Sequence, residues 1–303
     1  MADIFKPATP RVVHYVFGLE ADFGGKNFGL MHYLSVESVV VNLQPTQIMW
    51  HYVYLPTDEN FWWRNAKKFL TLNKIDQITR VFDKEIIHHA HKADVLRLQV
   101  VLRHGGIYLD SDMIIFRPFP PSFYSSGAIM AQEGAPDHFV GLCNAFIMAP
   151  PNDTFVTTWY NQYRTFNHSI WNYHSVQLPA HLWTAHPDTV RVLDHRKMFW
   201  PTWAPNHLDA ALSPKGGLMV NDVTGKKEWM KWDFMGSGQL GWHIWGQASW
   251  KKFLKNMTAH EVMVSDTGFN RAVRRFLVPL CGEDGMKCPA AENVNVTDPA
   301  WVW

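Results

Sequence analysis

Two aspartates, Asp110 and Asp112, are separated by one residue directly after the apolar segment 106–109. On an extended segment, residues i and i+2 point to the same side, so both carboxylates can face one cation. Hard oxygen ligands with positions left open suit Mg²⁺ or Mn²⁺, and either ion can bridge a diphosphate. An isolated Asp-x-Asp triplet is also compatible with a solvated turn, but here the pair lies between two apolar segments, 106–109 and 113–115, which favours a ligand site.

A second charged pair, Asp94 and Arg97, lies in the segment 92–104, whose apolar spacing predicts a helix that ends before Gly105. Three residues apart on a helix, the two side chains share one face. They can form an ordinary intrahelical salt bridge. Alternatively, Asp94 accepts hydrogen bonds from sugar hydroxyls while Arg97 donates to hydroxyl or phosphate oxygens.

The segments that carry these residues alternate between strand and helix patterns. Strands are predicted at 11–17, 47–55, 78–82, 106–116 and 144–149, and helices at 30–43, 61–72, 92–104 and 154–166. Such alternation predicts an α/β fold whose sheet is mostly parallel. Ligands of these sheets bind in crevices at the strand ends, which is where the aspartate pair falls.

The composition argues against several classes of protein. Lys+Arg 28 against Asp+Glu 27 gives a net charge of +1, so we expect no nucleic-acid partner. No run of about 18 apolar residues occurs, and we expect no transmembrane segment. The sequence has no internal repeat and no low-complexity linker, so it predicts one domain over 1–280 and a tail over 281–303. In this tail, Cys281 and Cys288 either form a disulfide or stay reduced. The 15 tryptophans indicate a heavy core or flat surfaces for sugars or bases.

The segment 91–119 resembles the signature of glycosyltransferase family 32, the DXD-containing sugar transferases. That signature is Ala-Asp at a helix start, Arg one turn later, a Gly-Gly turn, and then Tyr-x-Asp-x-Asp. Each position is matched here, by Ala93, Asp94, Arg97, Gly105, Gly106, Tyr108, Asp110 and Asp112. The family includes α-mannosyl-, α1,4-galactosyl- and α1,4-N-acetylglucosaminyltransferases, and the same arrangement recurs in the glucosyltransferase domains of large clostridial toxins.

The resemblance implies a GT-A fold, which is a single Rossmann-like nucleotide-sugar-binding domain with a mixed, mostly parallel sheet. It also implies metal-dependent transfer of a hexose with retention at the anomeric carbon. Mn²⁺, or Mg²⁺, would be held by Asp110, Asp112 and His243, although His243 also fits a core position among tryptophans. The donor would be a nucleotide sugar, with a UDP-sugar favoured over GDP-mannose, and the acceptor a glycan, glycolipid or protein hydroxyl.

The resemblance also implies the catalytic residues, which would be Asp94, Arg97 and Asp112. It further implies contacts with the donor at several other positions. The segment 11–17 resembles the family's first strand, which lines the nucleotide pocket, and the segment 241–250 resembles its C-terminal His-x-Trp-x-x-Ser-Trp block with one extra residue before the serine. The residues that would contact the donor are His14, Tyr15, Asp94, Arg97, Tyr108, Asn144, Ser249 and Trp250.

The sequence leaves the acceptor side open. Family members often carry Thr-Gly-Pro in the second half, where this chain has Leu178 in place of the glycine. Trp200 and Trp203 are either core residues or an aromatic surface on which the acceptor stacks.

The sequence also allows two functions other than sugar transfer, namely a glycan-binding protein with a degenerate site and a metal-dependent phosphohydrolase. The intact aspartate pair and Arg97 argue against the first, and the second needs more acids around the metal.

Overall fold

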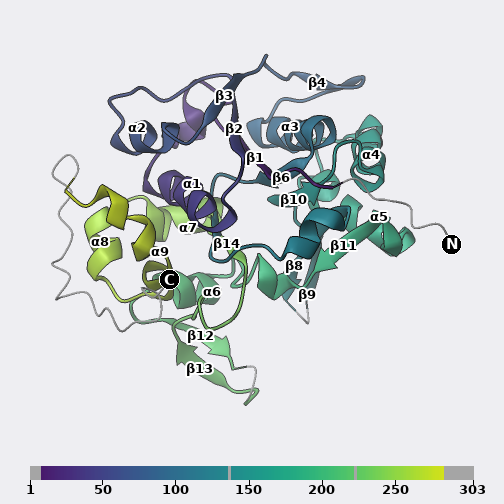
Figure 1. Ribbon diagram of the computed structural model, residues 1–303. Helices are drawn as coiled ribbons and strands as arrows, with labels where there is room; N and C mark the ends of the chain where they lie inside the picture. The colour runs from purple at the N-terminus through teal and green to yellow at the C-terminus, as the bar shows by residue number, and fades with distance from the viewer. Residues whose placement is uncertain (1–7, 136–137, 222–223, 283–303) are drawn as a thin grey trace.

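The computed structural model describes residues 8–135, 138–221 and 224–282. Eight strands form one sheet in the order β11-β8-β10-β6-β1-β2-β3, with β9 also paired to β8 (Figure 1). The strands are β1 (Val12–Val16), β2 (Gln47–Tyr52), β3 (Thr71–Lys74), β6 (Gly106–Leu109), β8 (Ala128–Ala135), β9 (His138–Leu142), β10 (Phe146–Ala149) and β11 (Val190–Leu193). The pairs β1–β2, β2–β3, β1–β6 and β8–β11 are parallel, and the other three are antiparallel. The prediction of an α/β fold with a mixed and mostly parallel sheet is confirmed.

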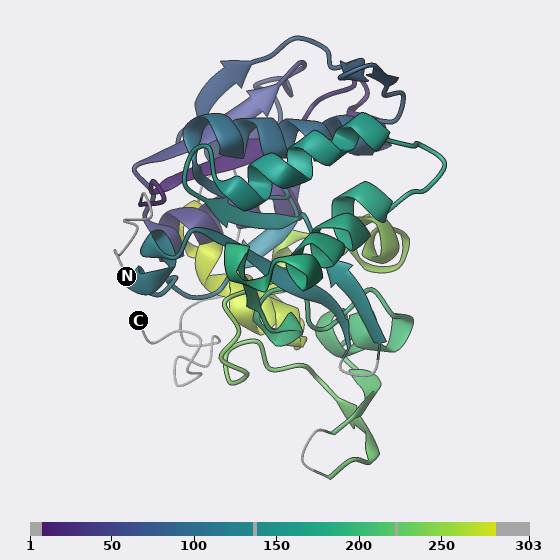
Figure 2. The same ribbon diagram turned by 90° about the vertical axis from the view of Figure 1, so that its right-hand side faces the viewer.

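Helices cover both faces of the sheet. They are α1 (Leu30–Leu43), α2 (Phe61–Lys67), α3 (His89–His104), α4 (Thr154–Asn161), α5 (Leu178–Ala185), α6 (Pro205–Leu212), α7 (Gly246–Ser249), α8 (Ala259–Val264) and α9 (Gly268–Val273). Three short strand pairs lie outside the sheet: β4 (Arg80–Val81) with β5 (Lys84–Glu85), β7 (Met113–Ile115) with β14 (Gly241–His243), and β12 (Gly217–Val220) with β13 (Lys227–Met230). The β12–β13 hairpin extends away from the body of the molecule (Figure 1 and Figure 2).

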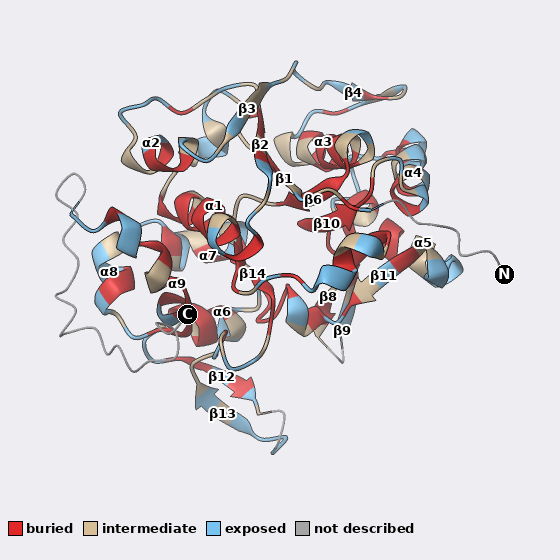
Figure 3. Cartoon of the chain, viewed as in Figure 1, coloured by how far each residue is buried: buried red, intermediate tan, exposed pale blue. Residues whose placement is uncertain are grey.

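Alternate residues of the central strands face the two helical layers. On β6, Ile107 and Leu109 pack in the core that includes α1, α6 and α9, whereas Tyr108 packs in the core that includes α3, α4 and α5. Because successive side chains of a strand point to opposite faces, a strand covered on both sides is apolar throughout. The central strands β1, β6, β8 and β10 are accordingly buried over most of their length (Figure 3).

Two of the predicted elements were wrong. The helix expected over 61–72 ends at Lys67, because residues 71–74 pair with β2 and become the edge strand β3. The segment 106–116 is not one strand: β6 pairs within the central sheet, while β7 pairs with β14 outside it. The aspartate pair therefore lies in a turn between two strands that belong to different sheets.

The tryptophans of the described residues divide between the core and the surface. Within the described residues, Trp50, Trp63, Trp159 and Trp242 are completely buried. Three others are exposed, namely Trp171, Trp203 and Trp229.

None of the helices in the described ranges has the length and apolar character needed to cross a bilayer. The predicted tail, 281–303, lies outside the described residues from 283 onward. Cys288 lies in that part of the chain, so both alternatives for Cys281 and Cys288, paired or reduced, stay as the sequence left them.

The glycine that ends α3 is required by its neighbours. Gly105 has φ +64°, and a Cβ there would lie 2.6 Å from Pro151 Cδ and 2.8 Å from Pro10 Cδ. Gly238 has φ +68°, but a Cβ there would have nothing within 4 Å. We expect Gly105→Ala to lower the free energy of unfolding by about 3 kcal/mol, from backbone strain plus overpacking, and Gly238→Ala by about 1 kcal/mol. Urea unfolding checks this, and equal losses in the two variants would contradict it.

Candidate active site

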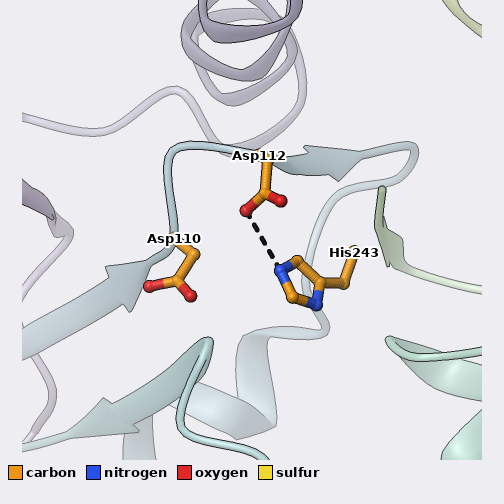
Figure 4. A group of neighbouring side chains, drawn as sticks. All are labelled: Asp110, Asp112 and His243. Carbon is orange, nitrogen blue, oxygen red and sulfur yellow. Dashed lines mark hydrogen bonds and ion pairs between the residues drawn. The ribbon is translucent and has the colours of Figure 1, made fainter. Parts of the chain in front are cut away.

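Three side chains from two distant segments meet at the turn after β6. Asp110 and Asp112 extend from this turn, and His243 is the last residue of β14 (Figure 4). In the antiparallel pairing of β14 with β7, His243 lies opposite Met113, the neighbour of Asp112. One ligand atom from each of the three lies within 4.8 Å of the others, and this is the only such cluster of His, Cys, Asp and Glu in the described part of the chain. Two carboxylates and one imidazole so placed fit a divalent cation.

Asp112 is held as a carboxylate by two donors. His243 Nε2 lies 3.0 Å from its Oδ1, and the amide N–H of Gly246 donates to its Oδ2 at 2.8 Å. Burial alone would raise the pKa of Asp112, but the charge and hydrogen bond of His243 and the amide of Gly246 hold this pKa well below its usual range. In turn, burial lowers the pKa of His243, and Asp112 outweighs burial and raises it. The local field therefore keeps Asp112 ionised.

Arg97 links α3 to the same turn. Its Nη1 lies 2.9 Å from Asp110 Oδ1 and donates to the backbone and side-chain oxygens of Asn144 at 2.8 and 3.0 Å. The guanidinium lies over the Tyr108 ring, 4.6 Å from its centroid. Burial lowers the pKa of Arg97, but Asp110 and its other acidic neighbours raise it above its ordinary value, so the side chain stays charged. The predicted salt bridge to Asp94 exists at 3.5 Å, which is longer than the contact with Asp110.

Asp94 and Tyr108 complete this network. The Asp94 carboxylate accepts a hydrogen bond from Asn144 Nδ2 at 2.7 Å. Burial raises the pKa of Asp94, while Arg97 and Asn144 oppose that rise. The Tyr108 hydroxyl donates to Asp110 Oδ1 at 2.6 Å. The helix, the strand and the turn that follow one another in the sequence are thus tied together by charge-assisted hydrogen bonds.

A cavity of about 650 Å³ opens onto these groups. The predicted site residues that line it are Asp94, Arg97, Tyr108, Asp110, Asp112, Asn144, His243 and Trp250. One cavity therefore contains both charged pairs, the histidine and a tryptophan of the C-terminal block.

Three predicted donor contacts, His14, Tyr15 and Ser249, do not line the cavity and are completely buried. The ring nitrogens of His14 hydrogen bond to His51 Nε2 at 3.0 Å and to the Gly105 carbonyl at 2.8 Å. The Ser249 hydroxyl donates to a backbone carbonyl in its own helical turn at 3.0 Å. The structure thus places these three behind the cavity wall, where they have partners of their own.

Some cavity residues were not predicted. Lys26 donates from Nζ to the Gly246 carbonyl at 3.3 Å, and this ammonium lies 5.4 Å from the centroid of the Trp250 ring. The Gly-rich loop around Lys26 was visible in the sequence as a possible signal. Glu133 also lines the cavity, but it lies in β8, a strand that the sequence pattern did not reveal.

Comparison with known proteins points to one family. Residues 34–133 match the family model described as a glycosyltransferase sugar-binding region containing a DXD motif. A protein of Cryptococcus neoformans var. grubii named Glucan organizing enzyme 1 is 35% identical over 280 residues, which are 89% of this chain and 71% of that protein.

Two other similarities are shorter or weaker. Subversion of eukaryotic traffic protein A of Legionella pneumophila is 30% identical over 81 residues, which are 27% of this chain and 13% of that protein. Among solved structures, the PaToxG glycosyltransferase aligns with a TM-score of 0.40 at 18% identity, over 60% of this chain and 72% of that one.

Proposed function

Because this chain belongs to the glycosyltransferases whose sugar-binding region contains a DXD motif, we propose that it moves a hexose from a nucleotide sugar, with a UDP-sugar favoured, to an acceptor hydroxyl with retention at the anomeric carbon. The observation that supports this proposal most is the convergence of Asp94 and Arg97 with the Asp110–Asp112–His243 cluster in one cavity. A nucleotide diphosphate needs positive charge to leave, and a sugar needs hydrogen-bond acceptors to be oriented; this cavity offers both.

Mn²⁺ is the cation we propose at the cluster, with Mg²⁺ as the alternative. An imidazole nitrogen beside two carboxylates favours a transition ion over Mg²⁺, whose sites are built of oxygen ligands. When bound, such a cation supplies the positive charge that stabilises the departing diphosphate. Asp112, already ionised and oriented by Gly246 and His243, needs little rearrangement to act as a ligand.

The protein side chains have separate roles in this proposal. Asp94 accepts hydrogen bonds from hydroxyls of the donor sugar, and Arg97 donates to a hydroxyl or phosphate oxygen while it holds Asp110 in place. Asn144 orients both Asp94 and Arg97, because it hydrogen bonds to each. Lys26 and Trp250 lie on the side of Gly246, where a cation and a flat ring suit the nucleotide diphosphate. With the donor so held, the acceptor hydroxyl attacks from the face that the diphosphate leaves.

A thermal-shift panel of UDP- and GDP-sugars, each with and without Mn²⁺, tests the proposal. Ligands that bind only the folded state raise the unfolding midpoint, by roughly 5 °C when present at about 100 times their Kd. We expect a UDP-sugar to give this rise only when Mn²⁺ is present. A panel in which no nucleotide sugar shifts the midpoint would argue for the degenerate glycan-binding alternative. Release of inorganic phosphate in place of sugar transfer would argue for a phosphohydrolase.

A further inference from the structure

Glu133 and the strand β1 lie on opposite sides of the Asp110–Asp112–His243 cluster. β8 runs parallel to β6, because both are antiparallel to β10, which lies between them. Glu133, near the carboxyl end of β8, and Asp110, just after β6, therefore lie at the same edge of the sheet. Two strand spacings separate them along this edge, which is roughly 10 Å. The end of β1, with Val16, lines the cavity on the opposite side of Asp110.

The strand pairing beside Glu133 is irregular. Glu133 pairs with Gly141 and Gly134 pairs with Phe139, so β9 has one extra residue, Val140, at this step. Irregularities of this kind bend strands and are frequent beside binding sites. Gly134 has φ +121°, and a Cβ there would lie 2.2 Å from the His138 carbonyl oxygen, so this bend requires glycine. Glu133 therefore lines the cavity at the point where the pairing of β8 with β9 changes register.

Glu133 accepts a hydrogen bond from a neutral donor. Trp203 Nε1 donates to its Oε1 at 3.3 Å. Burial raises the pKa of Glu133, while the Cys143 thiol, the charge of His243 and the Trp203 indole oppose the rise. A carboxyl group that is 8% exposed and bonded to one indole N–H can still accept from the hydroxyl of a ligand.

Aromatic surface lies beside this carboxyl. Trp203 is 46% exposed and Trp171 is 55% exposed, and both line the cavity, whereas Trp200 is buried. The bond to Glu133 fixes the orientation of the Trp203 indole. A fixed aromatic face with a carboxyl group at its edge matches a sugar ring, which has an apolar C–H face and hydroxyls around its rim.

We propose that Glu133 and Trp203 form the acceptor subsite, and that the acceptor is a carbohydrate. A hexose ring of the acceptor stacks on Trp203, and one of its hydroxyls donates to Glu133. This subsite and the proposed donor site, with Lys26 and Trp250, lie on opposite sides of Asp110. The acceptor ring bound on Trp203 would therefore face the anomeric carbon of the donor sugar. The proposal rests on the proposed function and narrows its acceptor from glycan, glycolipid or protein to a sugar ring.

Binding of neutral oligosaccharides tests the subsite without knowledge of the natural acceptor. Laminaritriose, mannotriose, galactotriose and chitotriose are presented to the full chain with UDP and Mn²⁺, and binding is followed by saturation-transfer NMR. We expect the wild type to bind at least one of them. Trp203→Ala and Glu133→Gln should each weaken that binding at least tenfold, while the midpoint shift produced by UDP and Mn²⁺ stays unchanged. The matched controls are Trp229→Ala and Glu228→Gln, both on β13, which should bind as the wild type does.

The outcomes separate this proposal from the function on which it rests. If UDP and Mn²⁺ fail to shift the wild-type midpoint and GDP fails too, the proposed function is wrong. If the nucleotide binds but none of the trisaccharides does, or if both variants bind sugar like the wild type, the function stands and the carbohydrate subsite is wrong. If Glu133→Gln does not fold, the binding measured for Trp203→Ala alone decides between these outcomes, because Trp203 is exposed and its substitution leaves the core unchanged. Once an acceptor of the wild type is known, the KM for this acceptor should rise in both variants.

Discussion

Asp112→Asn is expected to abolish sugar transfer and to leave the fold intact. The substitution keeps the shape of the side chain, and its carbonyl oxygen can still accept from the Gly246 amide. It removes the negative charge that faces His243 and that would hold a divalent cation. Loss of several kcal/mol of charge stabilisation corresponds to a roughly 10³-fold lower rate, because each 1.36 kcal/mol is about tenfold.

The measurement is the initial rate of transfer with the nucleotide sugar identified by thermal shift, together with urea unfolding of each variant. We expect Asp112→Asn to unfold cooperatively, with a free energy of unfolding at most about 3 kcal/mol below that of the wild type, because the charge that the fold stabilises at Asp112 is lost while the bond from the Gly246 amide is kept. Asp58→Asn is the matched control, since Asp58 forms an exposed ion pair with Lys67. That control should retain full activity. Transfer by Asp112→Asn at a rate near that of the wild type would overturn the assignment of the cluster.

Arg97→Met is expected to remove both activity and much of the stability. Arg97 is 5% exposed and is the positive partner of Asp94 and Asp110. Without it, the buried carboxylate of Asp94 and the half-buried carboxylate of Asp110 lose their counter-charge. Breaking a buried pair in this way costs about 3–5 kcal/mol. Arg97→Lys keeps the charge but cannot reach Asp94, Asp110 and Asn144 at once, because a lysine has one ammonium and no planar fork.

Urea unfolding and initial rates distinguish the two variants. Arg97→Lys should recover most of the unfolding free energy lost in Arg97→Met, yet its transfer rate should stay at least 100-fold below that of the wild type. Arg103→Met, on the exposed side of the same helix, controls for the loss of an arginine from α3. If Arg97→Met were as stable as Arg103→Met, the contacts of Arg97 with Asp94, Asp110 and Asn144 would not contribute to the stability of the fold.

The first half of the fold is local enough to follow from the sequence. The helix predicted at 30–43 coincides with α1, and the strand at 11–17 contains β1, because apolar periodicity and flanking glycine or proline mark both. The helix predicted at 61–72 was wrong beyond Lys67. There, pairing with β2 outweighs helical propensity, and a partner strand some 20 residues upstream is invisible to a local pattern.

The sequence by itself determined the centre of the site. Asp94 and Arg97 lie on one helix, and Asp110 and Asp112 lie in the turn after the strand that follows this helix, so geometry within a short stretch of chain brings Arg97 to 2.9 Å from Asp110. Only the tertiary structure decided the rest. His243 reaches Asp112 through the pairing of β14 with β7, across more than a hundred residues. Glu133 lines the cavity from β8, a strand that leaves no clear pattern in the sequence and whose pairing with β9 is irregular at this point. Which residues of β1 face the cavity was likewise decided by packing: Val16 lines it, while His14 is held behind its wall by His51. The local spacing of residues determines which side chains lie at the same edge of the sheet. Contacts between distant segments depend on the register in which their strands pair, and only the folded chain establishes this register.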